Sequence, residues 1–204
     1  MEIETSGGAA RVYLDGDARA ARFLFALTHG AGGGVEAPDL LAARDAGLSL
    51  GGLVARVLQP YRVRGARAPG AVDKQDAAWV EIAAALRGLA PGVPFIQGGR
   101  SNGARVACRT AVAVGARGVV ALAFPLHPPG KPDRSRVAEL RDCGVTALVV
   151  SGASDPFGIP DTADADEVVV VPGQTHALRG HGGTISAAIE RWLPTVLAGL
   201  PEHG

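Results

Sequence analysis

The chain has 204 residues, with 20 acidic and 20 basic side chains and a formal net charge of zero. This length suits one domain over residues 1–204, large enough to bury a sizeable core. The sequence lacks the clustered basic residues of a nucleic-acid binder, and no apolar run approaches the ~20 residues that a membrane span needs. We therefore expect that the protein binds neither nucleic acid nor a membrane.

Short β-branched segments alternate with longer segments rich in Ala, Leu and Arg, a pattern typical of a parallel sheet with helices on both faces. We predict strands at residues 10–14, 22–28, 50–59, 93–97, 118–124, 145–151 and 167–171. We predict helices at residues 38–46, 74–89, 102–114, 134–142 and 184–197. The fold class is therefore α/β, a doubly wound and mostly parallel sheet of roughly seven or eight strands.

Further local features concern a helix start, the first residues of the chain and the two cysteines. Asp73, with Asp76 three residues later, has the spacing of a capping box, so we expect the helix at 74–89 to begin there. Residues 1–14 have neither the basic nor the apolar part of a signal peptide, which favours a cytoplasmic protein. Cys108 and Cys143 are interpreted as small packing residues in a reducing compartment, and no metal-ligand or cofactor motif is visible.

The stretch Gly99-Arg100-Ser101-Asn102-Gly103 has the pattern G-x-S-x-G between a predicted strand and a predicted helix. In so sharp a turn the serine adopts strained backbone geometry, and glycines are required because a neighbouring Cβ would clash. The helix that follows offers free N–H groups beside the hydroxyl. Taken alone, the pattern also fits a turn that caps a helix. In its context it indicates a nucleophile elbow with Ser101 as nucleophile.

An activated serine needs a histidine base and an acid that orients it. Asp155 follows the predicted strand 145–151, and His176 follows the next predicted strand, 167–171. Because parallel strands end at one edge of the sheet, the loops carrying Ser101, Asp155 and His176 can meet there. The order Ser, Asp, His is that of α/β-hydrolases. The alternatives in the same loops are Asp161, Asp164 and Asp166 for the acid and His181 for the base.

An oxyanion needs two backbone N–H donors. One is expected from Asn102, directly after the serine. The other is expected from the loop His29-Gly30-Ala31-Gly32-Gly33-Gly34, with Ala31 preferred and Gly32 second. We expect His29 to brace this loop. The alternative, a flexible or phosphate-binding glycine loop, would want a Walker lysine, which the sequence lacks.

Four segments together resemble one branch of the α/β-hydrolases. They are T-H-G-A-G at residues 28–32, G-R-S-N-G-A-R at 99–105, F-P-L-H-P-P-G-K-P at 124–132 and D-P-F-G at 155–158. The branch contains bacterial dienelactone-hydrolase-like proteins and the hydrolase-like domain of a subunit of the non-specific-lethal (NSL) histone acetyltransferase complex. The resemblance implies the doubly wound fold and a Ser-Asp-His site, but not a substrate.

Several basic side chains follow the predicted strands at the same edge as the serine. Because arginine binds carboxylates and phosphates bidentately, they raise the hypothesis of an acidic substrate. The alternative is that they form structural pairs or are simply solvated. With His29 as a further contact, the candidate substrate-binding residues are Arg100, Arg62, Arg64, His127 and Lys131.

The sequence thus predicts a serine hydrolase acting on a small ester, lactone or thioester, acidic or not, without a cofactor or metal. Between Ser101 and Asp155 there is room for one helix-and-strand unit, so no cap domain is expected and the site should be open. The alternative function is a non-catalytic protein of hydrolase fold that binds a ligand or a partner. The oligomeric state is left open.

Overall fold

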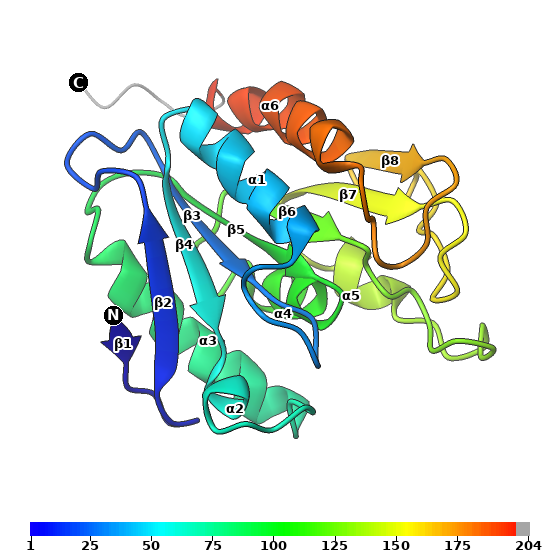
Figure 1. Cartoon of the computed structure of the whole chain (residues 1–204), viewed down its shortest axis with the longest axis horizontal. Helices are drawn as coiled ribbons and strands as arrows, with labels where there is room; N and C mark the ends of the chain where they lie inside the picture. The colour runs from blue at the N-terminus through cyan, green and yellow to red at the C-terminus, as the bar shows by residue number, and fades with distance from the viewer. Residues whose placement is uncertain (199–204) are drawn as a thin grey trace.

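A computed structural model describes residues 1–198 of the chain. Its centre is an eight-stranded sheet in the order β1-β2-β4-β3-β5-β6-β7-β8 (Figure 1). Strand β2 is antiparallel to both of its neighbours, β1 and β4, and the strands from β4 to β8 are all parallel to one another. The strands are β1 (Glu2–Ile3), β2 (Ala10–Asp15), β3 (Leu24–Thr28), β4 (Leu53–Leu58), β5 (Phe95–Arg100), β6 (Gly118–Leu122), β7 (Thr146–Gly152) and β8 (Glu167–Val171). The helices are α1 (Pro38–Ser49), α2 (Pro60–Val63), α3 (Val72–Arg87), α4 (Asn102–Thr110), α5 (Val137–Arg141) and α6 (Gly182–Ala198).

Helices cover both faces of the sheet, as Figure 1 shows, with α1 and α6 on one face and α3, α4 and α5 on the other. The core accordingly has two layers. Trp79 and Ile82 of α3 pack in one, and Leu40 of α1 with Ile189 of α6 pack in the other. The central strands are buried on both faces, which explains why their sequences are continuously apolar. The predicted doubly wound α/β fold is confirmed, and no cap interrupts the described strands.

Some details differ from the sequence prediction. The short strand β1 and the single-turn helix α2 were not predicted, because so few residues carry no periodic signal. The expected capping box is wrong: α3 begins at Val72, and Ala71 precedes it without a side-chain cap. The carboxylate of Asp76 instead accepts hydrogen bonds from Arg109 of α4, at 2.6 and 2.7 Å, and so ties two helices together.

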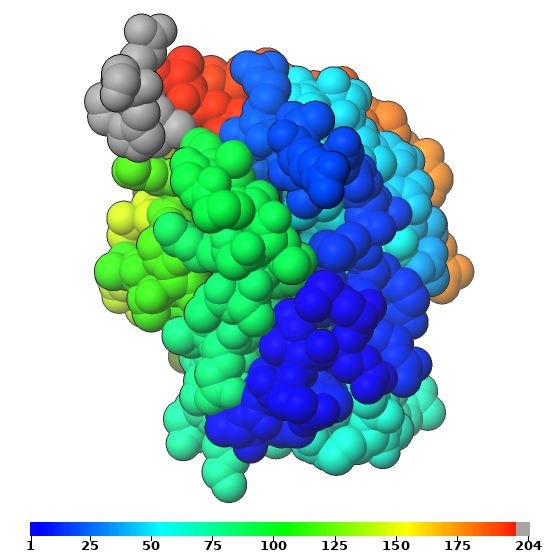
Figure 2. Space-filling model, turned by 90° about the vertical axis from the view of Figure 1, so that its left-hand side faces the viewer, coloured from blue at the N-terminus to red at the C-terminus, as the bar shows by residue number. Residues whose placement is uncertain are grey.

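The first residues of the chain lie against α3 on the side of the molecule shown in Figure 2. There the backbone N–H of Ser6 donates to the carboxylate of Glu81 at 2.6 Å, and a Cβ added at Gly7 would lie 3.1 Å from that of Ala78. Among residues 1–198, no helix has the length and apolar character that crossing a bilayer requires. The parallel strands all end at one edge of the sheet, and the loops after β3, β5, β7 and β8 build the site described next.

Candidate active site

Ser101 stands between β5 and α4 in backbone geometry that few residues adopt, with φ 53° and ψ −114°. Both glycines of the elbow are sterically required. A Cβ at Gly99 would lie 2.7 Å from the carbonyl oxygen of Thr28, and a Cβ at Gly103 would lie 2.5 Å from the same oxygen. The turn is therefore packed directly against the end of β3, and this close packing keeps Ser101 in its strained conformation.

The structure brings the hydroxyl of Ser101 together with His176 and Asp155. The Oγ of Ser101 lies 2.8 Å from Nε2 of His176, and Nδ1 of the same ring lies 2.8 Å from Oδ2 of Asp155. Because a carboxylate only accepts, Nδ1 carries the proton and Nε2 is left with the lone pair that faces the serine hydroxyl. This arrangement can take a proton from the serine.

Close contact between the two supporting loops depends on Gly152, the last residue of β7. A Cβ at that position would lie 2.4 Å from the carbonyl oxygen of Gln174, in the loop that carries His176. The N–H of Ser154 donates to the same oxygen at 2.8 Å. The loop that carries Asp155 is thus fastened to the loop that carries His176 through backbone.

Asp155 is held in one orientation and shielded from water. Its side chain is fully buried, and its Oδ1 accepts a hydrogen bond from the N–H of Phe157 at 2.9 Å. The ring of Phe157 packs on the imidazole of His176, with 4.2 Å between ring centroids. The sequence analysis did not single out Phe157, although it follows Asp155 by two residues.

The alternative acids and base have other contacts. Asp164 pairs with Arg141 at 2.7 Å, Asp161 accepts from the N–H of Ala163 in its own turn, and Asp166 accepts from the N–H of Ala147. His181 is half-buried, and its carbonyl accepts hydrogen bonds from the N–H groups of Thr184 and Ile185 in the first turn of α6. None of these four side chains takes a place beside Ser101 in the hydrogen bonds of residues 1–198.

The glycine loop after β3 lies directly over the serine. A Cβ added at Gly30 would lie 3.3 Å from the Cβ of Ser101, so this loop needs glycine to come so close. Gly33 closes a turn by donating to the carbonyl of Gly30 at 3.0 Å, and Gly32 faces open space. Asn102 is the first residue of α4, so its N–H belongs to the first turn, where no intrahelical acceptor exists. The two expected donors thus come from two neighbouring segments, Ala31 from the glycine loop and Asn102 from the first turn of α4.

His29 is fully buried and braces this loop, as expected. The N–H of Gln59 donates to its Nε2 at 3.0 Å, so Nδ1 carries the proton and donates to the carbonyl of Gly30 at 2.8 Å. Burial lowers the pKa of His29 to about 4, so the ring is neutral at ordinary pH. The hydroxyl of Tyr61, not foreseen from the sequence, supports the next residue by donating to the carbonyl of Ala31 at 3.0 Å.

The arginines expected to bind an acidic substrate are engaged by the protein. The Nε of Arg100 lies 2.6 Å from the carboxylate of Asp39, and its Nη2 donates to the carbonyl of His176 at 2.9 Å. Arg62 donates to the carbonyls of Gly33 and Ala66, at 2.9 and 3.0 Å. These guanidinium groups hold loops together, which is the structural alternative that the sequence left open.

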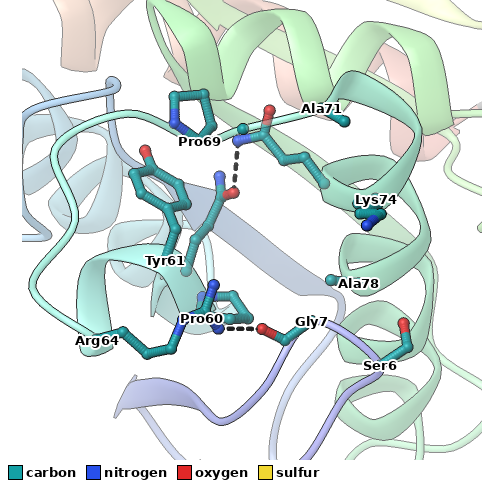
Figure 3. A pocket seen from close by; sticks show the side chains of 12 residues that line it. Ser6, Gly7, Pro60, Tyr61, Arg64, Pro69, Ala71, Lys74 and Ala78 are labelled. Atoms are coloured by element: carbon teal, nitrogen blue, oxygen red, sulfur yellow. Dashed lines mark hydrogen bonds between the residues drawn. The ribbon is translucent and has the colours of Figure 1, made fainter.

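Arg64 faces a different part of the molecule. Its guanidinium donates to the carbonyl of Gly7 and lines a pocket of about 410 Å³ whose lining contains no residue of the Ser101, His176 and Asp155 group (Figure 3). Tyr61 and Lys74 line the same pocket, between α2 and the first turns of α3. Tyr61, which lines this pocket, also contacts the glycine loop after β3 through its hydroxyl.

The proline-rich segment 124–132 contacts the loop that carries Asp155. The N–H of His127 donates to the carbonyl of Phe157 at 2.9 Å, and a Cβ at Gly158 would lie 2.5 Å from Nε2 of His127. His127 also contacts the carbonyl of Pro128 through Nδ1, and Lys131 is exposed further along the segment. The segment therefore supports the turn that places Asp155 and Phe157.

This geometry agrees with comparisons to known proteins. Residues 20–179 match the family model described as an alpha/beta hydrolase domain. The chain belongs to the α/β-hydrolase family. As a member of that family it is an enzyme of the hydrolase type. A search of curated protein sequences gave no match.

Solved α/β-hydrolase structures share the fold over nearly the whole chain. Est1E from Butyrivibrio proteoclasticus, with ferulic acid bound, has a TM-score of 0.78 and 16% identity over 97% of this chain and 99% of its own. XC6422 from Xanthomonas campestris, an α/β serine hydrolase without a lid, has a TM-score of 0.70 and 20% identity over 95% and 94%. Dienelactone hydrolase from Anabaena variabilis has a TM-score of 0.73 and 14% identity over 96% and 95%. Identities this low show the shared fold.

Proposed function

We propose that this chain is a serine hydrolase that cleaves small acyl esters, lactones or thioesters through an acyl-enzyme. Ser101 is the nucleophile, His176 the general base and acid, and Asp155 the residue that orients the imidazole. The observation that carries the proposal is the continuous hydrogen-bonded path from Asp155 through His176 to Ser101, with both contacts at 2.8 Å.

The reaction uses this path in two steps. The Oγ of Ser101 attacks the acyl carbon while Nε2 of His176 takes the hydroxyl proton, and the N–H groups of Ala31 and Asn102 receive the oxyanion. The C–O or C–S bond then breaks, and the protonated His176 gives its proton to the leaving group. Water, activated by the same ring, hydrolyses the acyl-enzyme and restores Ser101.

Two features guide the choice of substrate. No cap covers the edge of the sheet within the described residues, which favours a small substrate in an open site. Arg100 and Arg62 are engaged by protein acceptors, so neither favours an acidic group on the substrate. The support of the acid loop by segment 124–132 also leads us to propose that the chain falls in the dienelactone-hydrolase-like branch that includes the NSL subunit domain.

The test is labelling of the purified chain by a fluorophosphonate probe, with turnover of 4-nitrophenyl acetate measured in parallel. Ser101→Ala should abolish labelling and lower kcat by about 10⁶-fold, because the nucleophile is removed. Ser154→Ala is the matched control, an exposed serine beside Asp155 that should keep both activities. Labelling that persists in Ser101→Ala would refute the assignment of the nucleophile. A wild-type chain that neither labels nor turns over ester would favour the non-catalytic ligand-binding alternative.

A further inference from the structure

Arg100 is the variable second residue of the elbow, and its side chain reaches back across the site instead of out into solvent. Its guanidinium contacts two segments and lies beside a third, and the three come together only in the folded protein. Nε pairs with Asp39 at the start of α1, Nη2 donates to the carbonyl of His176, and Nη1 lies 3.2 Å from where a Cβ of Gly30 would stand. One planar group therefore binds Asp39 at the start of α1 and the loop that carries His176, and it leaves little room for a side chain at residue 30.

The carboxylate of Asp39 fixes this guanidinium. Asp39 is 1% exposed, and its Oδ1 accepts the N–H of Leu40 at 2.9 Å in the first turn of α1. Burial raises the pKa of Asp39, and the positive charge of Arg100 opposes that rise. Removing Arg100 would leave a buried carboxylate without a counter-charge, so the two side chains stay paired. An arginine held this way through Nε presents Nη2 in one direction only, toward the carbonyl of His176.

The contact to that carbonyl completes the support of the base. The ring of His176 is held by Asp155 at Nδ1, and its backbone is held by Arg100 at the carbonyl oxygen. We propose that Arg100, fixed by Asp39, is a positioning residue that sets where the His176 imidazole stands relative to Ser101. This proposal rests on the proposed function, since positioning matters for rate only if His176 is the base.

Arginine suits this task and lysine does not. The fork of arginine lets one side chain serve Asp39 and the His176 carbonyl at a fixed spacing, whereas a lysine ammonium is a single point. Arg100→Lys keeps the positive charge beside the buried Asp39 and so preserves the fold, but it cannot hold both partners in place. Misplacement of a catalytic group by about 1 Å can cost on the order of 100-fold in rate.

The experiment compares Arg100→Lys with wild type by three measurements. They are the fluorophosphonate inactivation rate, kcat and KM for 4-nitrophenyl acetate, and the low-field proton NMR signal of the His176 Nδ1–H. We expect kcat and the inactivation rate to fall about 10- to 100-fold with KM changed less than about twofold, because the loss lies in the transition state. The low-field signal should broaden, because the ring is less firmly held.

Arg87→Lys is the matched control. Arg87 donates through Nη1 to the carbonyl of Val114 at 2.7 Å, at the end of α3 and away from the loops that carry the site. The same substitution there should leave the rates and the signal unchanged. Asp39→Asn should give a smaller loss than Arg100→Lys, and the double variant should be no worse than Arg100→Lys alone, because the two residues act through one contact. Additive losses would overturn the role given to Asp39.

Three other outcomes are decisive. Rates and NMR signal that match wild type in Arg100→Lys would overturn the positioning role while leaving the proposed function intact. A loss confined to the acidic ester 4-nitrophenyl succinate, with 4-nitrophenyl acetate spared, would make Arg100 a substrate contact and equally overturn it. If the wild-type chain has no serine reactivity, the proposed function fails, and the NMR signal alone still decides whether Arg100 holds the His176 ring.

Discussion

Two loops at the same edge of the sheet, after β3 and after β8, each hold a histidine ring that donates through Nδ1 and accepts at Nε2, but the partners of the two rings differ. In the loop after β8, Nδ1 of His176 faces the carboxylate of Asp155 and Nε2 faces the hydroxyl of Ser101. In the loop after β3, Nδ1 of His29 faces the carbonyl of Gly30 and Nε2 accepts the backbone N–H of Gln59. His176 is 18% exposed at its side chain, and His29 is fully buried.

The partners decide the chemistry of each ring. In the proposed mechanism, the carboxylate of Asp155 stabilises the imidazolium that forms when His176 accepts a proton. His29 has no such acceptor: its Nε2 is occupied by an N–H donor, so a proton there would break the bond to Gln59. Under the proposed function, the same residue type therefore carries a proton in one loop and is a neutral hydrogen-bonding support in the other.

Asp155→Asn should give the largest effect, because it changes the hydrogen-bond partner by which the His176 ring differs from the His29 ring. The amide of asparagine can donate to Nδ1 and so favour the tautomer whose Nε2 carries the proton, which cannot accept one from Ser101. We expect kcat for 4-nitrophenyl acetate to fall by about 10⁴-fold.

Asp164→Asn is the control for this change, since Asp164 is also buried in the same loop but pairs with Arg141. It should keep kcat within about tenfold, as expected for a residue that does not contact the reacting groups. Equal losses of kcat in the two variants would mean that the loop carrying Asp155 has only a structural role. The proposed difference between His176 and His29 would then be wrong.

The second prediction concerns the neutral ring of His29 and the pH dependence of folding. The folded-state pKa is lowered to about 4, while an unfolded histidine titrates near 6.5. As the pH falls below ~6.5, His29 of the unfolded chain binds a proton, but the same residue in the folded chain stays neutral until about pH 4. The free energy of unfolding therefore declines between these two pH values. The loss from this one group is about 3 kcal/mol.

Urea unfolding of wild type and His29→Gln at a series of pH values measures this contribution as the difference between two curves. The variant should start less stable at pH 7, because it disturbs two buried hydrogen bonds, and should then lose less stability toward pH 4. His181→Gln, at a histidine that is only half-buried, should follow the wild-type curve. A His29→Gln curve parallel to wild type would contradict the lowered pKa.

Much of this could be predicted from the sequence because it depends on local patterns. Continuous apolar segments such as 118–122 predicted buried parallel strands, and strand ends in a parallel sheet share an edge. The order of Ser101, Asp155 and His176 then predicted the loops in which these side chains lie. Glycines on both sides of Ser101 indicated the tight elbow before its contacts were known.

What the sequence could not give is the partner of each charged side chain. Arg100 was expected to face a substrate, but its acceptor Asp39 lies 61 positions earlier and is brought near only by the sheet. Asp39 itself reads as an ordinary first-turn acid of α1, and nothing local reveals that it is buried. Tyr61 and Phe157 likewise gain their roles from loops that are distant in sequence.

The smallest expected effect concerns Phe157, the ring that packs on the working histidine, with 4.2 Å between centroids and 31° between planes. Aromatic contacts of this kind contribute about 0.5–1.5 kcal/mol, which corresponds to roughly 2- to 12-fold in rate if the contact is lost in the transition state. Phe157→Leu keeps the apolar bulk and the N–H that donates to Asp155 but removes the ring, so kcat should fall within that range. Phe157→Tyr retains the ring and should keep the wild-type kcat. If the leucine variant matches wild type, the backbone of residue 157 supports the site and its ring does not.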